Sequence, residues 1–155
     1  MEKIALFAVA AVVAIIVLVI LVRMPLPKAV VAPATIPGTT MNSGESAIIY
    51  RFAVSAERAD VKIEQIYLTS SQGVSLTNLY LYDNNDIQLP GALYYSSEGK
   101  IRYWPDWPIV IPKGTTKIFN LRGNVAGQGT LIIFMEDMAV EKGSVKGLPS
   151  VVITL

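Results

Sequence analysis

The chain has 155 residues, of which 52% are hydrophobic, and a formal net charge of +1. From Pro33 onward ten Lys/Arg stand against eleven Asp/Glu, so no basic surface can hold nucleic acid by counterion release, and we expect no nucleic-acid partner. The absence of Cys and His excludes disulfide frameworks, thiol catalysis, Cys/His zinc sites, blue copper and histidine triads.

Residues 4–22 are 19 consecutive positions without a polar or charged side chain. As an α-helix this run would be roughly 28 Å long, close to the thickness of a bilayer core. Three interpretations compete: a cleaved signal peptide, a single membrane anchor and the core of a filament. The run is longer than the apolar region of a usual signal peptide, and Pro33 directly follows the best cleavage site. We therefore expect the run to remain in the mature protein.

A helix that is apolar on every face can be buried in lipid or in a bundle of its own copies. Small residues, which let helices approach closely, recur here at intervals of three and four. The predicted helix core for assembly consists of Ala5, Ala8, Ala10, Ala11, Ala14 and Ile15. The same alanines are ordinary in a membrane anchor, so the anchor and the filament both stay open.

The layout of an apolar N-terminal helix followed by a β-rich domain resembles that of type IV pilins, including the archaeal ones. The resemblance covers the layout of the whole chain but no specific motif, since Ala5 stands where bacterial pilins usually carry a glutamate, with an acid instead at Glu2. It implies a homopolymer of this chain, inserted in the membrane before assembly, with the helix as filament core and the β-domain facing solvent.

Residues 24–44 contain four prolines and two glycines among several threonines. Pro25 and Pro27 are expected to end the helix of residues 1–23, because proline removes a backbone donor and clashes one turn back. The rest of the stretch predicts an extended spacer. The third part of the chain, residues 45–155, is the expected β-domain.

Apolar and polar residues alternate with period two after Gly44. The pattern predicts strands at residues 48–54, 61–68, 74–81, 93–95, 101–104, 109–111, 116–121, 130–135 and 151–155. Slips in the alternation between Glu64 and Gln65, and near Thr77-Asn78, predict bulges. Short strands separated by turn signals at this spacing are typical of an all-β sandwich or barrel.

Two blocks, residues 74–83 (VSLTNLYLYD) and 111–117 (IPKGTTK), resemble a domain type found in surface proteins of bacteria and archaea. The resemblance implies an immunoglobulin-like extracellular module and no chemistry. The expected fold class is therefore all-β: an immunoglobulin-like β-sandwich preceded by one long apolar N-terminal α-helix.

Five aromatic residues lie close together in the sequence, interleaved with prolines and an aspartate. They are Tyr94, Tyr95, Tyr103, Trp104 and Trp107. Exposed, they would form a protein interface or stack on the rings of a glycan, and buried, they would close one end of the sandwich. All three interpretations stay open.

The other polar clusters are better explained as turn and strand residues than as metal or catalytic sites. The loop Asp83-Asn84-Asn85-Asp86 offers four oxygen side chains for calcium but lacks the spacing of an EF-hand, and we favour a turn. Glu136 and Asp137 are expected on opposite faces of a strand and so make a poor glycosidase pair. We find no catalytic constellation, metal site or cofactor site, and expect no enzyme.

Two hypotheses follow. The first is a structural subunit of an extracellular surface filament. The second is a single-pass, membrane-anchored binding module that uses the aromatic-rich face for a surface ligand or glycan. Both place the β-domain outside the cell, whereas Arg23 and Lys28 after the apolar run, against Lys3 before it, favour a cytoplasmic C-terminal side.

Overall fold

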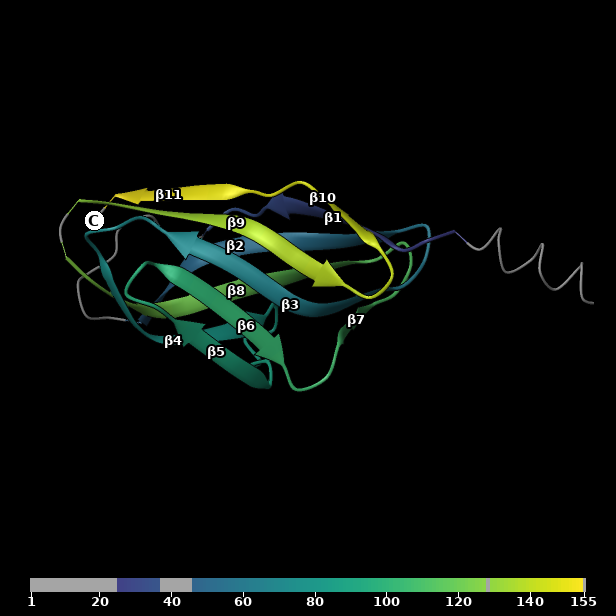
Figure 1. The fold of residues 1–155 in the computed structure, drawn as a ribbon, viewed down its shortest axis with the longest axis horizontal. Helices are drawn as coiled ribbons and strands as arrows, with labels where there is room; N and C mark the ends of the chain where they lie inside the picture. Colours follow the sequence, from purple (N-terminus) through teal and green to yellow (C-terminus); the bar gives the residue numbers. More distant parts are fainter. Residues whose placement is uncertain (1–24, 37–45, 128, 155) are drawn as a thin grey trace, which may run out of the picture.

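The chain forms a two-layer, all-β sandwich in the computed structural model, which describes residues 25–36, 46–127 and 129–154 (Figure 1). The strands in these residues are β1 (Lys28–Pro33), β2 (Ser46–Glu57), β3 (Val61–Ser70), β4 (Ser75–Asp83), β5 (Gly91–Tyr95), β6 (Lys100–Pro105), β7 (Ile109–Ile111), β8 (Thr116–Ala126), β9 (Thr130–Val140), β10 (Ser144–Lys146) and β11 (Ser150–Thr154). The prediction of an all-β sandwich is confirmed.

The strands are divided between two sheets. Sheet A has the order β10-β1-β2-β8-β4 and sheet B the order β11-β9-β3-β6-β5, while β7 pairs with β3 beyond the end of β6. The pairings within the sheets are antiparallel except that of β1 with β10, which is parallel. Because the chain crosses repeatedly between the sheets, residues far apart in sequence meet in the core and on each outer face.

The core lies between the sheets, because alternate residues of each strand point inward. Phe52 of β2 and Phe119 of β8 are fully buried and stack with their ring centroids 5.1 Å apart. Tyr50 is also fully buried, and its hydroxyl donates to the carbonyl of Pro149 at 2.6 Å. Burial raises the pKa of that hydroxyl, so Tyr50 acts as a neutral donor that joins the two sheets.

Both predicted bulges are confirmed. The register of β3 against β9 shifts between Ile63 and Gln65, and that of β4 against β8 shifts between Thr77 and Tyr80. A bulge lets one strand keep its apolar residues inward on both sides of a slip in the alternation. Ile63 and Ile66 are accordingly both buried, although they lie three residues apart.

The expected spacer at residues 24–44 is wrong over its middle part. Residues 28–33 form strand β1, which lies between β2 and β10 and buries Ala29 and Val31. The domain therefore begins well before residue 45. Proline is tolerated here because Ala34, not Pro33, donates to β2, and β10 pairs with β1 only as far as Val30, so the nitrogen of Pro33 lies on an unpaired edge.

The expected N-terminal helix at residues 1–23 lies outside the described residues, and so do all six residues of its predicted assembly core. In the parts of the chain that the structure describes, no helix has the length and apolar character needed to cross a membrane.

Candidate binding face

The outer face of sheet B gathers aromatic and charged side chains from three neighbouring strands. Along β6, Ile101 and Tyr103 point into the core, so the alternation turns Lys100, Arg102 and Trp104 outward. Arg102 is paired with Tyr67 of β3 on one side and with Tyr94 of β5 on the other. Side chains at directly paired positions are in contact distance, so this register sets Arg102 between two tyrosines.

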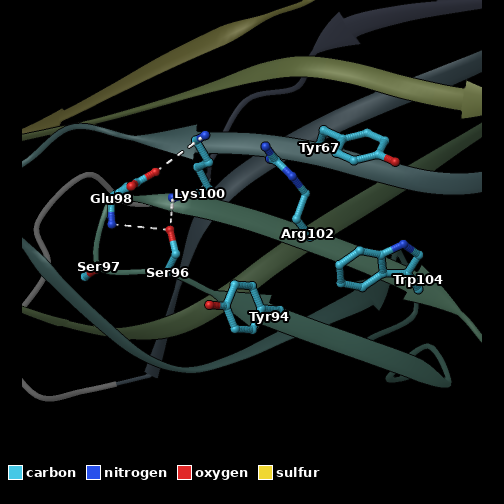
Figure 2. Close-up of a pocket in the computed structure, with 8 residues that line it drawn as sticks. All are labelled: Tyr67, Tyr94, Ser96, Ser97, Glu98, Lys100, Arg102 and Trp104. Carbon is cyan, nitrogen blue, oxygen red and sulfur yellow. Dashed lines mark hydrogen bonds and ion pairs between the residues drawn. The ribbon is translucent and has the colours of Figure 1, made fainter.

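These side chains border an open depression of about 510 Å³ on the outer face. We call it the aromatic groove; its lining residues are Tyr67, Tyr94, Ser96, Ser97, Glu98, Lys100, Arg102 and Trp104. Figure 2 shows them along β6 and the adjoining parts of β3 and β5. Tyr94 is 58% exposed, and the partly exposed Trp104 presents a second large ring.

Arg102 is held in place from several sides. Its guanidinium carbon lies 4.8 Å from the centroid of the Tyr67 ring, its Nη2 donates to Glu136 Oε2 at 2.9 Å, and its Nη1 donates to the carbonyl of Leu68 at 3.2 Å. The Thr69 hydroxyl donates to the other carboxylate oxygen of Glu136. This hydrogen bond, followed by the charge of Arg102, lowers the pKa of Glu136, so the carboxylate is ionised at neutral pH. The guanidinium therefore needs little ordering before it meets a ligand.

A tight turn closes one end of the groove. Ser96 Oγ accepts hydrogen bonds from the backbone N–H of Glu98 at 3.3 Å and of Lys100 at 3.2 Å. Lys100 Nζ lies 3.5 Å from Glu98 Oε2 (Figure 2). The turn places one positive and one negative side chain at the rim, where solvent weakens their mutual attraction and leaves both available to a partner.

The structure divides the five predicted aromatic residues among three environments. Tyr94 and Trp104 line the aromatic groove. Tyr103 is only 4% exposed and donates to the carbonyl of Pro90 at 2.9 Å, while the partly buried Tyr95 packs against the core. Trp107 is 70% exposed and lines a separate depression of about 310 Å³, which Tyr103 also lines. The core interpretation thus applies to Tyr103 and Tyr95, Tyr94 and Trp104 share one exposed face, and Trp107 lies apart from that face.

Three residues of the face were not singled out from the sequence: Tyr67, Arg102 and Glu136. The expectation that Glu136 and Asp137 lie on opposite faces of a strand was wrong, because both side chains are exposed. The cause is a bulge, seen as a shift in the register of β3 against β9 between Tyr67 and Leu68. The sequence held a signal of this bulge: Met135 and Met138, both buried, lie three positions apart, which is a slip in the alternation of β9.

The loop after β4 has the predicted turn geometry. Asp83 Oδ1 accepts the backbone N–H of Asn85 at 2.8 Å and of Ile87 at 3.0 Å. Two of its other oxygen side chains face cations of the protein itself, because Arg51 donates to Asn84 Oδ1 and Arg122 donates to Asp86 Oδ1. The described part of the chain contains no group of three or more acidic residues placed to share a metal ion.

The chain matches no protein-family model and no curated protein. Among solved structures, it is similar to the cohesin module of a family 33 glycoside hydrolase from Clostridium perfringens, with 10% sequence identity, a TM-score of 0.47, and coverage of 83% of this chain and 96% of that one. It is also similar to a non-cellulosomal cohesin from the archaeon Archaeoglobus fulgidus, with 11% identity, a TM-score of 0.39, and coverage of 80% and 89%. Likeness at this level identifies neither a partner nor an activity.

Proposed function

We propose that this chain is a cell-surface binding module and that the outer face of sheet B binds a protein partner, with the aromatic groove at its centre. The observation that carries the proposal is the convergence of Tyr67, Tyr94, Trp104 and Arg102 on one open depression. Tyrosine, tryptophan and arginine dominate the binding energy of protein interfaces, because each buries a large area and also carries a polar group that can pair with the partner.

A protein partner fits the face better than a small ligand does. The groove is open and bordered by charges of both signs, whereas small-molecule sites are usually enclosed and mostly apolar. The same face continues beyond the groove to the exposed side chains of Ile132 and Phe134 on β9. Together these side chains spread over several strands, as a contact with a folded protein requires.

Selection of peptides on the intact protein tests the proposal. A displayed library of random cyclic peptides is selected against the full chain in mild detergent, and the affinities of the selected peptides are measured for four variants. We expect Tyr94→Ala and Trp104→Ala to weaken binding at least about tenfold, as loss of a central aromatic residue does. Trp107→Ala, outside the groove, and Tyr80→Ala, an exposed side chain on sheet A, should leave the affinity unchanged.

Two results would overturn the proposal. One is a set of selected peptides whose affinities do not respond to either change in the groove. The other is binding of oligosaccharides, tested with a panel of β-linked and mannose-rich oligomers, that depends on Trp104 while no peptide does. That result would assign the face to glycans, whose rings stack on the same aromatic side chains.

For residues 4–22 we propose attachment of the module to the cell surface, either as the core of a pilin-like filament of identical chains or as a single membrane anchor. The support is the uninterrupted run of 19 apolar residues. The two forms differ in their behaviour in detergent, since a filament is sheared from cells as a polymer and an anchored chain is extracted as a monomer or small oligomer.

A further inference from the structure

Three turns at one end of the sandwich each place a basic side chain in solvent. Arg58 lies in the turn between β2 and β3, Lys113 in the turn between β7 and β8, and Lys142 in the turn between β9 and β10. The first two turns are joined, since the backbone N–H of Lys113 donates to Asp60 Oδ1 at 2.8 Å, and the end of β9 is paired with the start of β3. We call Arg58, Lys113 and Lys142 the basic end.

The acidic side chains in and beside these turns are engaged within the protein. Two of them form ion pairs with lysines of adjacent strands, Glu57 with Lys28 and Glu141 with Lys62. The third, Asp60, accepts the backbone N–H described above. In contrast, no residue of the basic end forms an ion pair within the described part of the chain. Its three charges therefore face solvent.

The backbone of two of these turns favours other residue types. Arg58 has a φ of 65° and Lys142 a φ of 51°, in the left-handed region that asparagine and glycine adopt far more readily. Strained backbone conformations of this kind cluster where function requires a particular side chain. The turns at the opposite end of the sandwich, residues 71–74, 96–99 and 127–129, contain no Lys or Arg.

The chain enters the domain at the basic end, beside the turn that carries Lys142 (Figure 1). The backbone N–H of Ser144 donates to the carbonyl of Pro27 at 3.1 Å, which fixes the entry on this turn. In the sequence, only two residues separate Pro25 from the apolar run. Three residue steps span at most about 11 Å, so a run inserted in a bilayer would hold the basic end close to the lipid headgroups.

We propose that the basic end docks on anionic lipid headgroups of the leaflet from which the domain emerges, so that the sandwich stands upright on the membrane. Lipid suits this surface because its charge is complementary and the apolar run supplies it at high local concentration. The inference rests on the proposed insertion of residues 4–22 in a membrane, which the filament and the anchor share before assembly. The turn at Ser96, which closes the aromatic groove, would then point away from the membrane.

The test uses the full chain, which lacks cysteine, reconstituted in vesicles that carry an acceptor dye on a small fraction of the headgroups. Gln72→Cys, in an exposed turn at the opposite end, carries the donor dye. Single-molecule energy transfer then reports the height of this end above the bilayer. An upright domain gives low transfer, because a strand of 11 residues such as β8 is roughly 35 Å long. A domain that swings on its tether gives higher transfer.

We expect upright domains to dominate in vesicles with about 30% phosphatidylglycerol. They should be lost in phosphatidylcholine alone, or at about 1 M salt, where the Debye length is about 3 Å. In the anionic vesicles, Arg58→Asn combined with Lys142→Asn should lower the ratio of upright to tilted domains at least about tenfold. The same variant should keep or raise the temperature of thermal unfolding, because asparagine suits the left-handed backbone.

Two control variants separate charge at this end from other effects. Arg58→Lys combined with Lys142→Arg keeps both charges and should dock like the wild type. Lys100→Gln removes a charge from the opposite end of the sandwich and should also dock like the wild type.

Three results would overturn the proposal. The first is an upright population that responds neither to the lipid charge nor to the asparagine variant. The second is a loss of docking in that variant matched by a lower unfolding temperature, which would assign the two residues to the fold. The third is upright domains found only where several chains cluster, which would assign the contact to neighbouring copies. A chain that does not float with neutral vesicles would overturn the proposed membrane insertion as well, whereas the other results leave it standing.

Discussion

Tyr103 and Tyr94 illustrate how one residue type serves two purposes on adjacent strands. Tyr103 fills the core, where burial raises the pKa of its hydroxyl to about 12, and Tyr94 stands in solvent. We expect Tyr103→Ala to lower the free energy of unfolding by about 3–5 kcal/mol, because it leaves a large cavity. Tyr94→Ala should cost less than about 0.5 kcal/mol. Urea denaturation of both variants measures the difference.

The hydroxyl of Tyr103 can be assessed separately. Tyr103→Phe keeps the ring and leaves the carbonyl of Pro90 without this donor, so we expect a loss of about 1 kcal/mol. If Tyr94→Ala proved as destabilising as Tyr103→Ala, the assignment of Tyr94 to a solvent-exposed binding face would be incorrect.

Glu136 couples stability to pH. The pKa of its carboxyl is lowered in the folded protein, first by the hydrogen bond from Thr69 and then by Arg102. A lowered pKa means that the ionised group stabilises the fold at a pH above the ordinary value of 4.5, and that this contribution is lost as the pH falls through the folded pKa. Because the side chain of Glu136 is 34% exposed, we expect Glu136→Gln to cost no more than about 1 kcal/mol at pH 7.

Thermal unfolding of wild type and Glu136→Gln between pH 7 and pH 3 gives the measurement. The two curves should converge as the pH is lowered, since both chains then lack the charge. Glu141→Gln provides a comparison: the pKa of Glu141 is also lowered, by its hydrogen bond with Lys62, so its curve should converge with that of wild type in the same way while the contacts of Arg102 stay intact. A stability difference that stays constant down to pH 3 would show that the substitution acts through packing instead.

Strand β1 is an integral part of the domain, which therefore begins before residue 34. Its buried residues Ala29 and Val31 complete sheet A, and Gly147 packs so closely on it that a Cβ there would lie 2.2 Å from the Val31 carbonyl oxygen. A chain of residues 25–155 should therefore unfold cooperatively with a β-sheet circular dichroism spectrum. A chain of residues 34–155, in which β2 becomes an edge and β10 has no partner strand, should lose several kcal/mol.

The two truncated chains are compared by urea denaturation and by binding of a dye specific for exposed apolar surface. Val31→Asp in the longer chain provides a matched variant, because it keeps the backbone of β1 and places a charge in the core. Equal stability of the two truncated chains would show that β1 is dispensable.

Alternation of apolar and polar residues was sufficient to predict most strands after residue 46 and two of the bulges. It was not sufficient for β1, where prolines flank a short apolar segment, or for β10, which has three residues. The pairing of strands is set by crossovers between sheets and is not visible in one sequence. For that reason the contact of Tyr67 with Arg102, and hence the groove, could not be predicted.

Trp107 shows why a cluster in sequence need not be a cluster in space. Pro105 ends β6 and Pro108 precedes β7, so the alternation that turns Trp104 outward is interrupted before it reaches Trp107. Prolines fix the backbone dihedral φ and remove a ladder donor. The two tryptophans therefore line different depressions, although only two residues separate them.

For the whole molecule, the filament hypothesis makes a prediction about residues 4–22. A charge within the run, as in Ala11→Asp or Ile15→Lys, would be buried in lipid or between helices at a cost of several kcal/mol. We expect either change to abolish polymers in negative-stain micrographs of material sheared from cells. Trp104→Ala and Trp107→Ala, which alter the β-domain, should leave the polymers intact.

Other outcomes would reassign the polymer contact. Loss of filaments with Trp104→Ala and their survival with Ala11→Asp would place the polymerising surface on the β-domain. If wild-type cells yield no polymer at all, the anchored binding module is the better description. Membrane fractions are examined alongside, since a charge in the run can also reduce insertion.

The places where the chain enters β1 and leaves β11 have a mechanical consequence. β1 is entered at one end of the long axis and β11 ends at the other (Figure 1), so a pull that separates residues 25 and 154 acts along the strands. Hydrogen bonds loaded in this direction are sheared together, whereas bonds loaded across the strands open one after another. A pull applied between these two ends of the domain would thus act along its most resistant direction.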